Sequence, residues 1–248
     1  MKITTRIQRF LLQRSLRKHK IPLKLWHQTI AKMPLALRYQ GREKMRLRLL
    51  ASEVLMEKKI IPVQGFKLTD EERVVIATQV AIGLFGLDDP ETDSSLSWIR
   101  NWNQILVYPM AFHNGRKTVF NTQGLLQSWA GFESGETRYQ GGIIIDWLDD
   151  QPHPLRKFAN QVLLHEMAHK LDMLDGDTNG HPPLHSNMSQ QAWYEAFEAA
   201  FEDLNEQVLQ GKSTAFNPYA ATNPAEFFAV STEYFFEAPQ VLNRLFPK

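Results

Sequence analysis

Residues 162–174 read Val-Leu-Leu-His-Glu-Met-Ala-His-Lys-Leu-Asp-Met-Leu and contain neither glycine nor proline. An uninterrupted run of this kind predicts a helix, which we extend to Phe158–Leu174. Positions i and i+4 of a helix share a face, so the imidazoles of His165 and His169 can reach one cation. Glu166 lies beside them, where a carboxylate can act as general base on an attacking water molecule. This pattern is typical of a zinc peptidase.

The alternative interpretation is structural, with two histidines on a half-buried helix satisfied by hydrogen bonds. A buried helix is predicted by the apolar residues around the pair, which are Val162, Leu163, Leu164, Met167 and Ala168. Burying two titratable side chains on such a helix costs free energy unless they bind a partner. We therefore interpret both histidines as metal ligands.

A catalytic zinc site has three protein ligands and one open position, so a third ligand is required. Asp175 lies six residues after His169, as in one zinc-peptidase class, but that class needs a turn-forming glycine where this chain has Asp172. Glu226, in Asn223-Pro-Ala-Glu, is the other candidate, although it also fits a helix-capping box with Asn223 as the N-cap. The missing glycine favours Glu226, and Asp175 stays the alternative.

The rest of the chain predicts an α+β domain with a small mixed sheet and a mainly helical C-terminal half. β-branched and apolar runs predict strands over Gln104–Tyr108 and Gly142–Trp147. Three acids at 70–72 open an apolar run that reaches Leu87 and predicts a buried helix. Further helices are expected over Gln190–Leu209 and Pro224–Phe236, and the aromatic residues at 227, 228 and 234–236 are expected in the core.

Composition limits the chemistry and divides the chain. The 248 residues include no cysteine, so any metal site must use histidine and carboxylate ligands. Residues 1–50 hold 14 of the 28 Lys and Arg residues but only one acid, Glu43, which predicts a basic, partly helical N-terminal arm ahead of a domain over 51–248. We expect a cytoplasmic protein, because basic residues interrupt the N-terminal apolar stretch before a signal sequence can form, and the longest apolar stretch, Val74 to Leu87, is shorter than a membrane span.

Several motifs, in the same order along the chain, resemble the Mlc titration factor A family of bacterial zinc peptidases, between about Ile61 and Pro239. The motifs are Ile61-Pro-Val-Gln-Gly-Phe66, Ile105-Leu-Val-Tyr-Pro109, Gly142 to Leu148, His165 to Asp172 with Asp175-Gly176, Tyr219 to Glu226, Phe228-Ala-Val230 and Glu233-Tyr-Phe-Phe236. Such a set is much more specific than the two-histidine pattern alone.

The resemblance implies a zincin-like metallopeptidase domain that holds one zinc ion through His165, His169 and Glu226. It implies Glu166 as the general base and Tyr219 as a catalytic tyrosine facing the reacting carbonyl. It further implies aminopeptidase-like activity on a peptide or protein substrate and binding to the Mlc repressor of glucose uptake.

Other residues have competing interpretations. Asp172 lies two turns after His165 and is a candidate to orient a ligand, against an ordinary surface aspartate. His181 and His185 fit an exposed, turn-rich loop better than a metal site. Two rival functions stay open: a zinc-containing protein that sequesters a regulator, which an intact Glu166 disfavours, and an adaptor that binds nucleic acid or a membrane surface through the basic arm. The acidic remainder of the chain makes nucleic-acid binding the weaker of these expectations.

Overall fold

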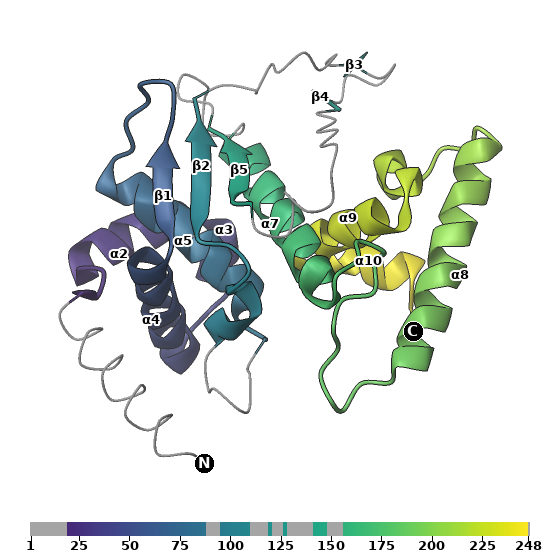
Figure 1. Cartoon of the computed structure of the whole chain (residues 1–248), viewed down its shortest axis with the longest axis horizontal. Helices are drawn as coiled ribbons and strands as arrows, with labels where there is room; N and C mark the ends of the chain where they lie inside the picture. The colour runs from purple at the N-terminus through teal and green to yellow at the C-terminus, as the bar shows by residue number, and fades with distance from the viewer. Residues whose placement is uncertain are drawn as a thin grey trace. The chain divides into compact units, whose positions relative to one another are not determined.

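The computed structural model describes residues 19–87, 95–109, 119–120, 126–127, 141–147 and 156–247 (Figure 1). Residues 1–18, which carry the first part of the predicted basic arm, lie outside the described residues. The chain divides into two compact units, one formed by Met1–Pro109 with Gly141–Trp147 and the other by Met110–Gln140 with Leu148–Lys248.

The first unit combines helices with a three-stranded sheet. Its described elements are α2 (Leu23–Ile30), α3 (Pro34–Leu37), α4 (Gly41–Glu57), β1 (Lys59–Pro62), α5 (Asp70–Leu84), the 3-10 turn η1 (Ser95–Ile99), β2 (Gln104–Tyr108) and β5 (Ile143–Asp146). Helix α4 runs through position 50, where the sequence predicted the end of the arm, and residues 19–50 contribute α2, α3 and most of α4. The division into an arm and a domain stays a prediction.

The sheet has the strand order β1-β2-β5, and both pairings are parallel (Figure 1). Ile60 pairs with Ile105, which in turn pairs with Ile143, and all three side chains are buried. The predicted strands at β2 and β5 are confirmed, and both pairings that the described residues form in this sheet are parallel, where a mixed sheet was expected. Parallel neighbours need long crossover connections, and the chain supplies one in α5, which lies between β1 and β2 in sequence.

Helix α5 begins where the acids at 70–72 predicted. Thr69 and Glu72 form a full capping box: the Thr69 hydroxyl accepts from the Glu72 backbone N–H, and the Glu72 carboxylate accepts from the Thr69 backbone N–H at 2.8 Å. The indole N–H of Trp147, just beyond β5, donates to the same carboxylate at 3.2 Å. This glutamate therefore ties the start of α5 to the end of the sheet.

Close packing at the sheet explains one glycine. A Cβ at Gly142 would lie 2.6 Å from the backbone oxygen of Gln104 on the neighbouring strand. Only a residue without a side chain lets β5 approach β2 this closely at that point.

The second unit is mainly helical. Its described elements are the short strands β3 (Val119–Phe120) and β4 (Leu126–Gln127), α7 (Arg156–Asp172), η2 (Met173–Asp175), α8 (Gln190–Leu209), η3 (Pro218–Thr222), α9 (Pro224–Glu237) and α10 (Pro239–Leu245). The predicted helices at α7, α8 and α9 are confirmed to within two residues at each end. Helix α7 packs against α9 (Figure 1), and η3 packs against both α8 and α9.

An aromatic core holds α8, η3 and α9 together. Phe197, Phe216 and Phe227 are buried in it, and the rings of Phe197 and Phe227 meet edge to face with centroids 5.1 Å apart. The expectation that the whole aromatic tail is core is wrong for Phe235, which is 60% exposed. Phe235 follows Tyr234 directly, so the two side chains leave the helix in different directions, and only Tyr234 turns toward Phe216.

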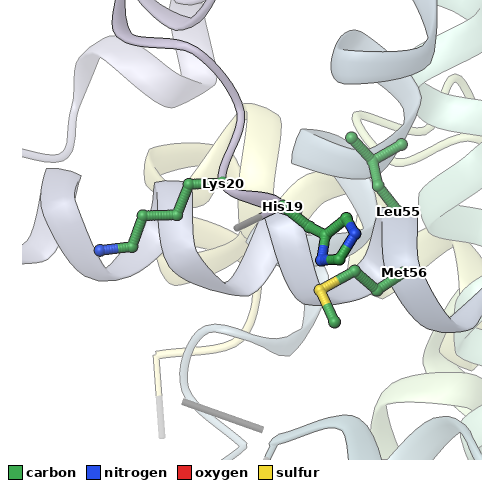
Figure 2. Close-up of a pocket in the computed structure, with 4 residues that line it drawn as sticks. All are labelled: His19, Lys20, Leu55 and Met56. Carbon is green, nitrogen blue, oxygen red and sulfur yellow. The ribbon is translucent and has the colours of Figure 1, made fainter. Parts of the chain in front are cut away.

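None of the helices in the described part of the chain combines the length and the apolar character needed to cross a bilayer. A hollow of about 460 Å³ in the first unit is lined by His19, Lys20, Leu55 and Met56 (Figure 2). It contains none of the residues that the sequence singled out as catalytic or metal-ligating.

Candidate metal centre

Helix α7 presents its two histidines side by side. The Nε2 atoms of His165 and His169 are 3.1 Å apart, and the rings meet edge to face with centroids separated by 4.7 Å. Leu163, Leu164 and Met167 are buried, as expected for a helix whose apolar positions face a core. The i, i+4 spacing thus has the geometric result predicted from the sequence.

Helix α9 brings Glu226 to this pair. The Glu226 Oε2 atom lies 3.0 Å from His165 Nε2 and 3.6 Å from His169 Nε2. Among the described residues, these three side chains form the group able to hold a metal ion, and Asp175 is not part of it. Asp175 instead lies exposed at the end of η2.

The start of α9 explains the position of Glu226. Asn223 is the N-cap, with its Oδ1 accepting from the Glu226 backbone N–H at 2.9 Å, and Pro224 occupies the first turn. This half of the predicted capping box is confirmed. The Glu226 carboxylate is directed at the histidines and not back at the cap, so the carboxylate is available as a ligand while Asn223 alone caps the helix.

The site concentrates negative charge beside partly buried imidazoles. Burial lowers the pKa of His165, but the carboxylates of Glu226 and Glu233 outweigh burial and raise this pKa to about 10. Burial raises the pKa of Glu226, and the opposing effect of the two histidines is larger, so the net pKa is well below its usual range. A positive charge at this position is therefore strongly favoured, whether a proton or a metal ion supplies it.

One buried atom lacks a partner. Glu226 Oε2 receives no well-aligned hydrogen bond within the described part of the chain, even though His165 Nε2 is 3.0 Å away. Two imidazole nitrogens and one carboxylate oxygen that converge in this way form the ligand set that zinc takes in many peptidases. The residues present therefore fit a zinc ion.

The two predicted catalytic side chains also lie at this site. Glu166 follows His165 on α7 and is half-buried, and among the described residues its carboxylate accepts no hydrogen bond. Tyr219 lies on η3, where the Asn217 side chain accepts from its backbone N–H at 3.0 Å. The Tyr219 ring is 6.3 Å from that of His165, centroid to centroid. Burial, followed by the field of Glu226, raises the pKa of Tyr219, so its hydroxyl keeps its proton and can donate it in a hydrogen bond.

A further carboxylate, which the sequence reasoning gave no role, contacts His165. Glu233 Oε1 lies 2.7 Å from His165 Nδ1. The signal that could have found it is spacing, because Glu233 follows Glu226 by seven residues and two helical turns return it to the same face.

Asp172 has a different partner from the one expected. It is fully buried, and its Oδ2 accepts from the backbone N–H of Gly180 at 2.9 Å. It forms no hydrogen bond with His165 or His169 in the described structure. Burial raises the pKa of Asp172. Both interpretations made from the sequence, a ligand-orienting carboxylate and a surface aspartate, are replaced by a carboxylate that holds the loop before α8.

The two loop histidines, His181 and His185, are half-buried rather than exposed as expected, and neither belongs to the metal-ligand group found among the described residues. His181 Nε2 lies 3.3 Å from Glu198 Oε1 on α8, and its ring stacks on Tyr194. His185 lies in the same loop. Glu198 thus links α8 to this loop.

Comparison with known proteins adds the family. The sequence profile described as "Glucose-regulated metallo-peptidase M90" matches residues 7–248. The chain therefore belongs to this metallo-peptidase family. It is 34% identical over 224 residues to "Mlc titration factor A" of Cronobacter sakazakii, and equally to the proteins of that name from Escherichia fergusonii and Salmonella typhi. Each match covers 90% of this chain and 81% of the relative.

The family match is wider than the resemblance seen in the motifs. It includes residues 7–60, most of the basic N-terminal segment, and extends to residue 248. Most of the basic segment is therefore part of the region that the family profile describes, and is not an addition peculiar to this chain.

Proposed function

We propose that this chain is a zinc-dependent peptidase with a zincin-like catalytic unit, in which His165, His169 and Glu226 hold one zinc ion. The observation that carries the proposal is the convergence of their three ligand atoms at 3.0–3.6 Å, with Glu226 Oε2 buried and lacking an aligned donor. Membership in a metallo-peptidase family supports the same chemistry.

Bound zinc would supply Lewis acidity, which lowers the pKa of a water molecule to about 7 and polarises a peptide carbonyl. Glu166, beside the ligands and without a hydrogen-bond donor of its own in the described residues, accepts the proton of the attacking water. It then delivers that proton to the leaving amine.

Tyr219 stabilises the transition state in this proposal. Its raised pKa keeps the hydroxyl protonated, and its ring lies next to that of His165. A protonated hydroxyl donates a hydrogen bond to the carbonyl oxygen as negative charge develops there.

The substrate is a peptide or protein, and the resemblance to the family adds aminopeptidase-like cleavage to the proposal. A regulatory role is proposed as well, since the relatives are named for titration of Mlc. This role is binding to an Mlc-like transcriptional repressor in the cytoplasm. The alternative for the whole chain is a non-catalytic, zinc-containing protein that only sequesters such a repressor.

Metal content and peptide hydrolysis, measured on the same preparation, test the proposal. We expect about one zinc per chain by elemental analysis and cleavage of at least one member of a broad panel of peptides with free and blocked N-termini. Zinc bound to a folded chain that cleaves none of them would reject the peptidase and leave sequestration as the better account.

The variant Glu166→Gln separates catalysis from binding. Glutamine keeps the size of the side chain but cannot accept the proton, so hydrolysis should fall by roughly 10²–10⁴-fold. Zinc content and repressor binding should stay as in the unmodified chain. Equal hydrolysis by the variant would remove Glu166 from the mechanism.

A further inference from the structure

A second carboxylate on α9 faces the far side of the His165 ring. Glu233 Oε1 lies 2.7 Å from His165 Nδ1, whereas the candidate ligand Glu226 Oε2 lies 3.0 Å from Nε2. The side chain of Glu233 is only 17% exposed, close to the values for His165 and Glu226. The ring of His165 is therefore held between two carboxylates, one at each nitrogen.

The two carboxylates reach His165 because of their spacing on one helix. Glu226 is in the first turn of α9, and Glu233 is two turns further along it. Helix α9 packs along α7, which carries the histidine. One helix pair therefore supplies both the proposed metal ligands and the group behind one of them.

The contact with Glu233 determines which nitrogen of the His165 ring keeps a proton when the other nitrogen binds a metal. An ionised carboxylate can only accept a hydrogen bond, so the 2.7 Å contact places a proton on Nδ1 of His165. A metal ion that binds Nε2, the nitrogen that faces His169 Nε2 and Glu226, takes the place of any proton there, while Nδ1 keeps its proton on Glu233. The ring protonated only at Nδ1 is the tautomer able to bind a metal at the point where the three ligand atoms converge.

We propose that Glu233 is a positioning residue for the metal centre: it accepts the hydrogen bond from His165 Nδ1–H and so keeps Nε2 of that ring free and directed at the zinc ion. This inference rests on the proposed function, because it assumes zinc at His165, His169 and Glu226. Glu233 is not itself a ligand in this account, since it lies at the opposite ring nitrogen and outside the metal-holding group of the described residues.

Two substitutions at Glu233 separate its hydrogen bond from its packing. Glu233→Gln keeps an acceptor oxygen at the same reach, whereas Glu233→Leu fills a similar volume without any acceptor. The matched control is Glu198→Leu, which removes the carboxylate of the other histidine–glutamate pair in this unit, the 3.3 Å contact with His181.

The readout is the zinc dissociation constant of the full chain at one fixed pH, measured by competition with a chromophoric chelator. Loss of a carboxylate behind a ligating histidine weakens metal binding by about 10–100-fold, and we expect this loss in Glu233→Leu. Glu233→Gln should stay within a few-fold of the unmodified chain, and so should Glu198→Leu. Unchanged affinity in Glu233→Leu, or an equal loss in Glu198→Leu, would overturn the proposal.

A measurement on the unmodified chain does not depend on how the variants fold. In the zinc-loaded protein, long-range proton–nitrogen correlation spectra of the histidine rings should show His165 protonated at Nδ1 and bound to the metal through Nε2. The opposite assignment, with the proton on Nε2, would overturn the role of Glu233 while leaving zinc in the site. Absence of stoichiometric zinc from the unmodified chain would instead overturn the proposed metal centre, and the role of Glu233 with it.

Discussion

The carboxylate of Asp172, at the end of the histidine-bearing helix α7, accepts a hydrogen bond from the backbone N–H of Gly180 at 2.9 Å. Gly180 has a φ of +81°, and a Cβ added there would overlap the ring of Phe197 on α8. The indole N–H of Trp193 donates to the Gly180 carbonyl at 3.3 Å. The loop between α7 and α8 is thus anchored from both helices at one glycine.

Asp172→Ala should therefore destabilise the fold. The substitution leaves the buried Gly180 N–H without its acceptor, which costs about 1–3 kcal/mol in the free energy of unfolding. Urea unfolding of the zinc-free chain measures this loss directly. Asp175→Ala is the control, because Asp175 is exposed three residues away and should change stability by less than about 0.5 kcal/mol. Equal stabilities for the two variants would contradict the anchoring role.

Glu226→Ala and Asp175→Ala should differ sharply in zinc content. Removing Glu226 takes away one of three converging ligand atoms, so the purified variant should lose its zinc, whereas Asp175→Ala should keep it. Elemental analysis after dialysis measures both. Retention by Glu226→Ala together with loss from Asp175→Ala would assign the third ligand to Asp175.

The helix cap provides an internal control for that experiment. Asn223 caps α9 through its own side chain, so Asn223→Ala should cost about 0.5–2 kcal/mol in unfolding free energy. In the zinc-free state Glu226→Ala should leave this cap in place. Loss of zinc by Glu226→Ala would then report on coordination and not on a frayed helix.

Local patterns were enough to predict three helices of the second unit, α7, α8 and α9, but not α10. The uninterrupted run around His165, the Asn223-Pro224 start of α9 and the boundaries of α8 each follow from nearest neighbours along the chain. Parallel pairing of β1, β2 and β5 did not follow, because it depends on contacts between residues about 40 positions apart. Strand β1 was not predicted either, because its four residues are too few to show a clear alternation of apolar and polar side chains.

At the metal centre, too, local spacing could be predicted from the sequence and contacts between distant segments could not. Fixed spacing placed His165 beside His169, since helical geometry alone requires it. The contacts of Asp172 with Gly180 and of Glu233 with His165 depend on how α7 packs against a loop and against α9. Spacing places Glu233 on the same face of α9 as Glu226, but no local pattern shows that this face packs against His165. The expected roles of these two carboxylates were accordingly wrong for Asp172 and absent for Glu233.

The free energy of unfolding should fall as the pH rises toward about 7, because of the titration of Glu53. Burial, followed by repulsion from Glu57, raises the pKa of Glu53 on α4 to about 7. Between its ordinary value and about 7 the folded state holds a proton that the unfolded state releases, so stability decreases as pH rises through that window.

Glu53→Gln removes this titration. The variant should melt above the unmodified chain at pH 8, by an amount equivalent to about 1–2 kcal/mol once solvent screening is allowed for, and the two should converge near pH 4. Melting curves across this range, recorded without zinc, provide the measurement. A difference that is the same at both pH values would exclude Glu53 as its source.

Tyr219→Phe tests the last member of the site. The ring stays and only the hydroxyl is lost, so the contacts of the aromatic face with His165 and the core should survive. Because that hydroxyl keeps its proton, we expect it to donate to the oxyanion, and its loss should lower kcat by about 10²–10³-fold. The zinc content should not change, since Tyr219 is outside the three ligands.

Steady-state kinetics on a cleaved peptide, with metal analysis of the same sample, test the role of Tyr219. If kcat stays at the level of the unmodified chain, Tyr219 is a packing residue of η3, and the two histidines, Glu226 and Glu166 account for the chemistry without it.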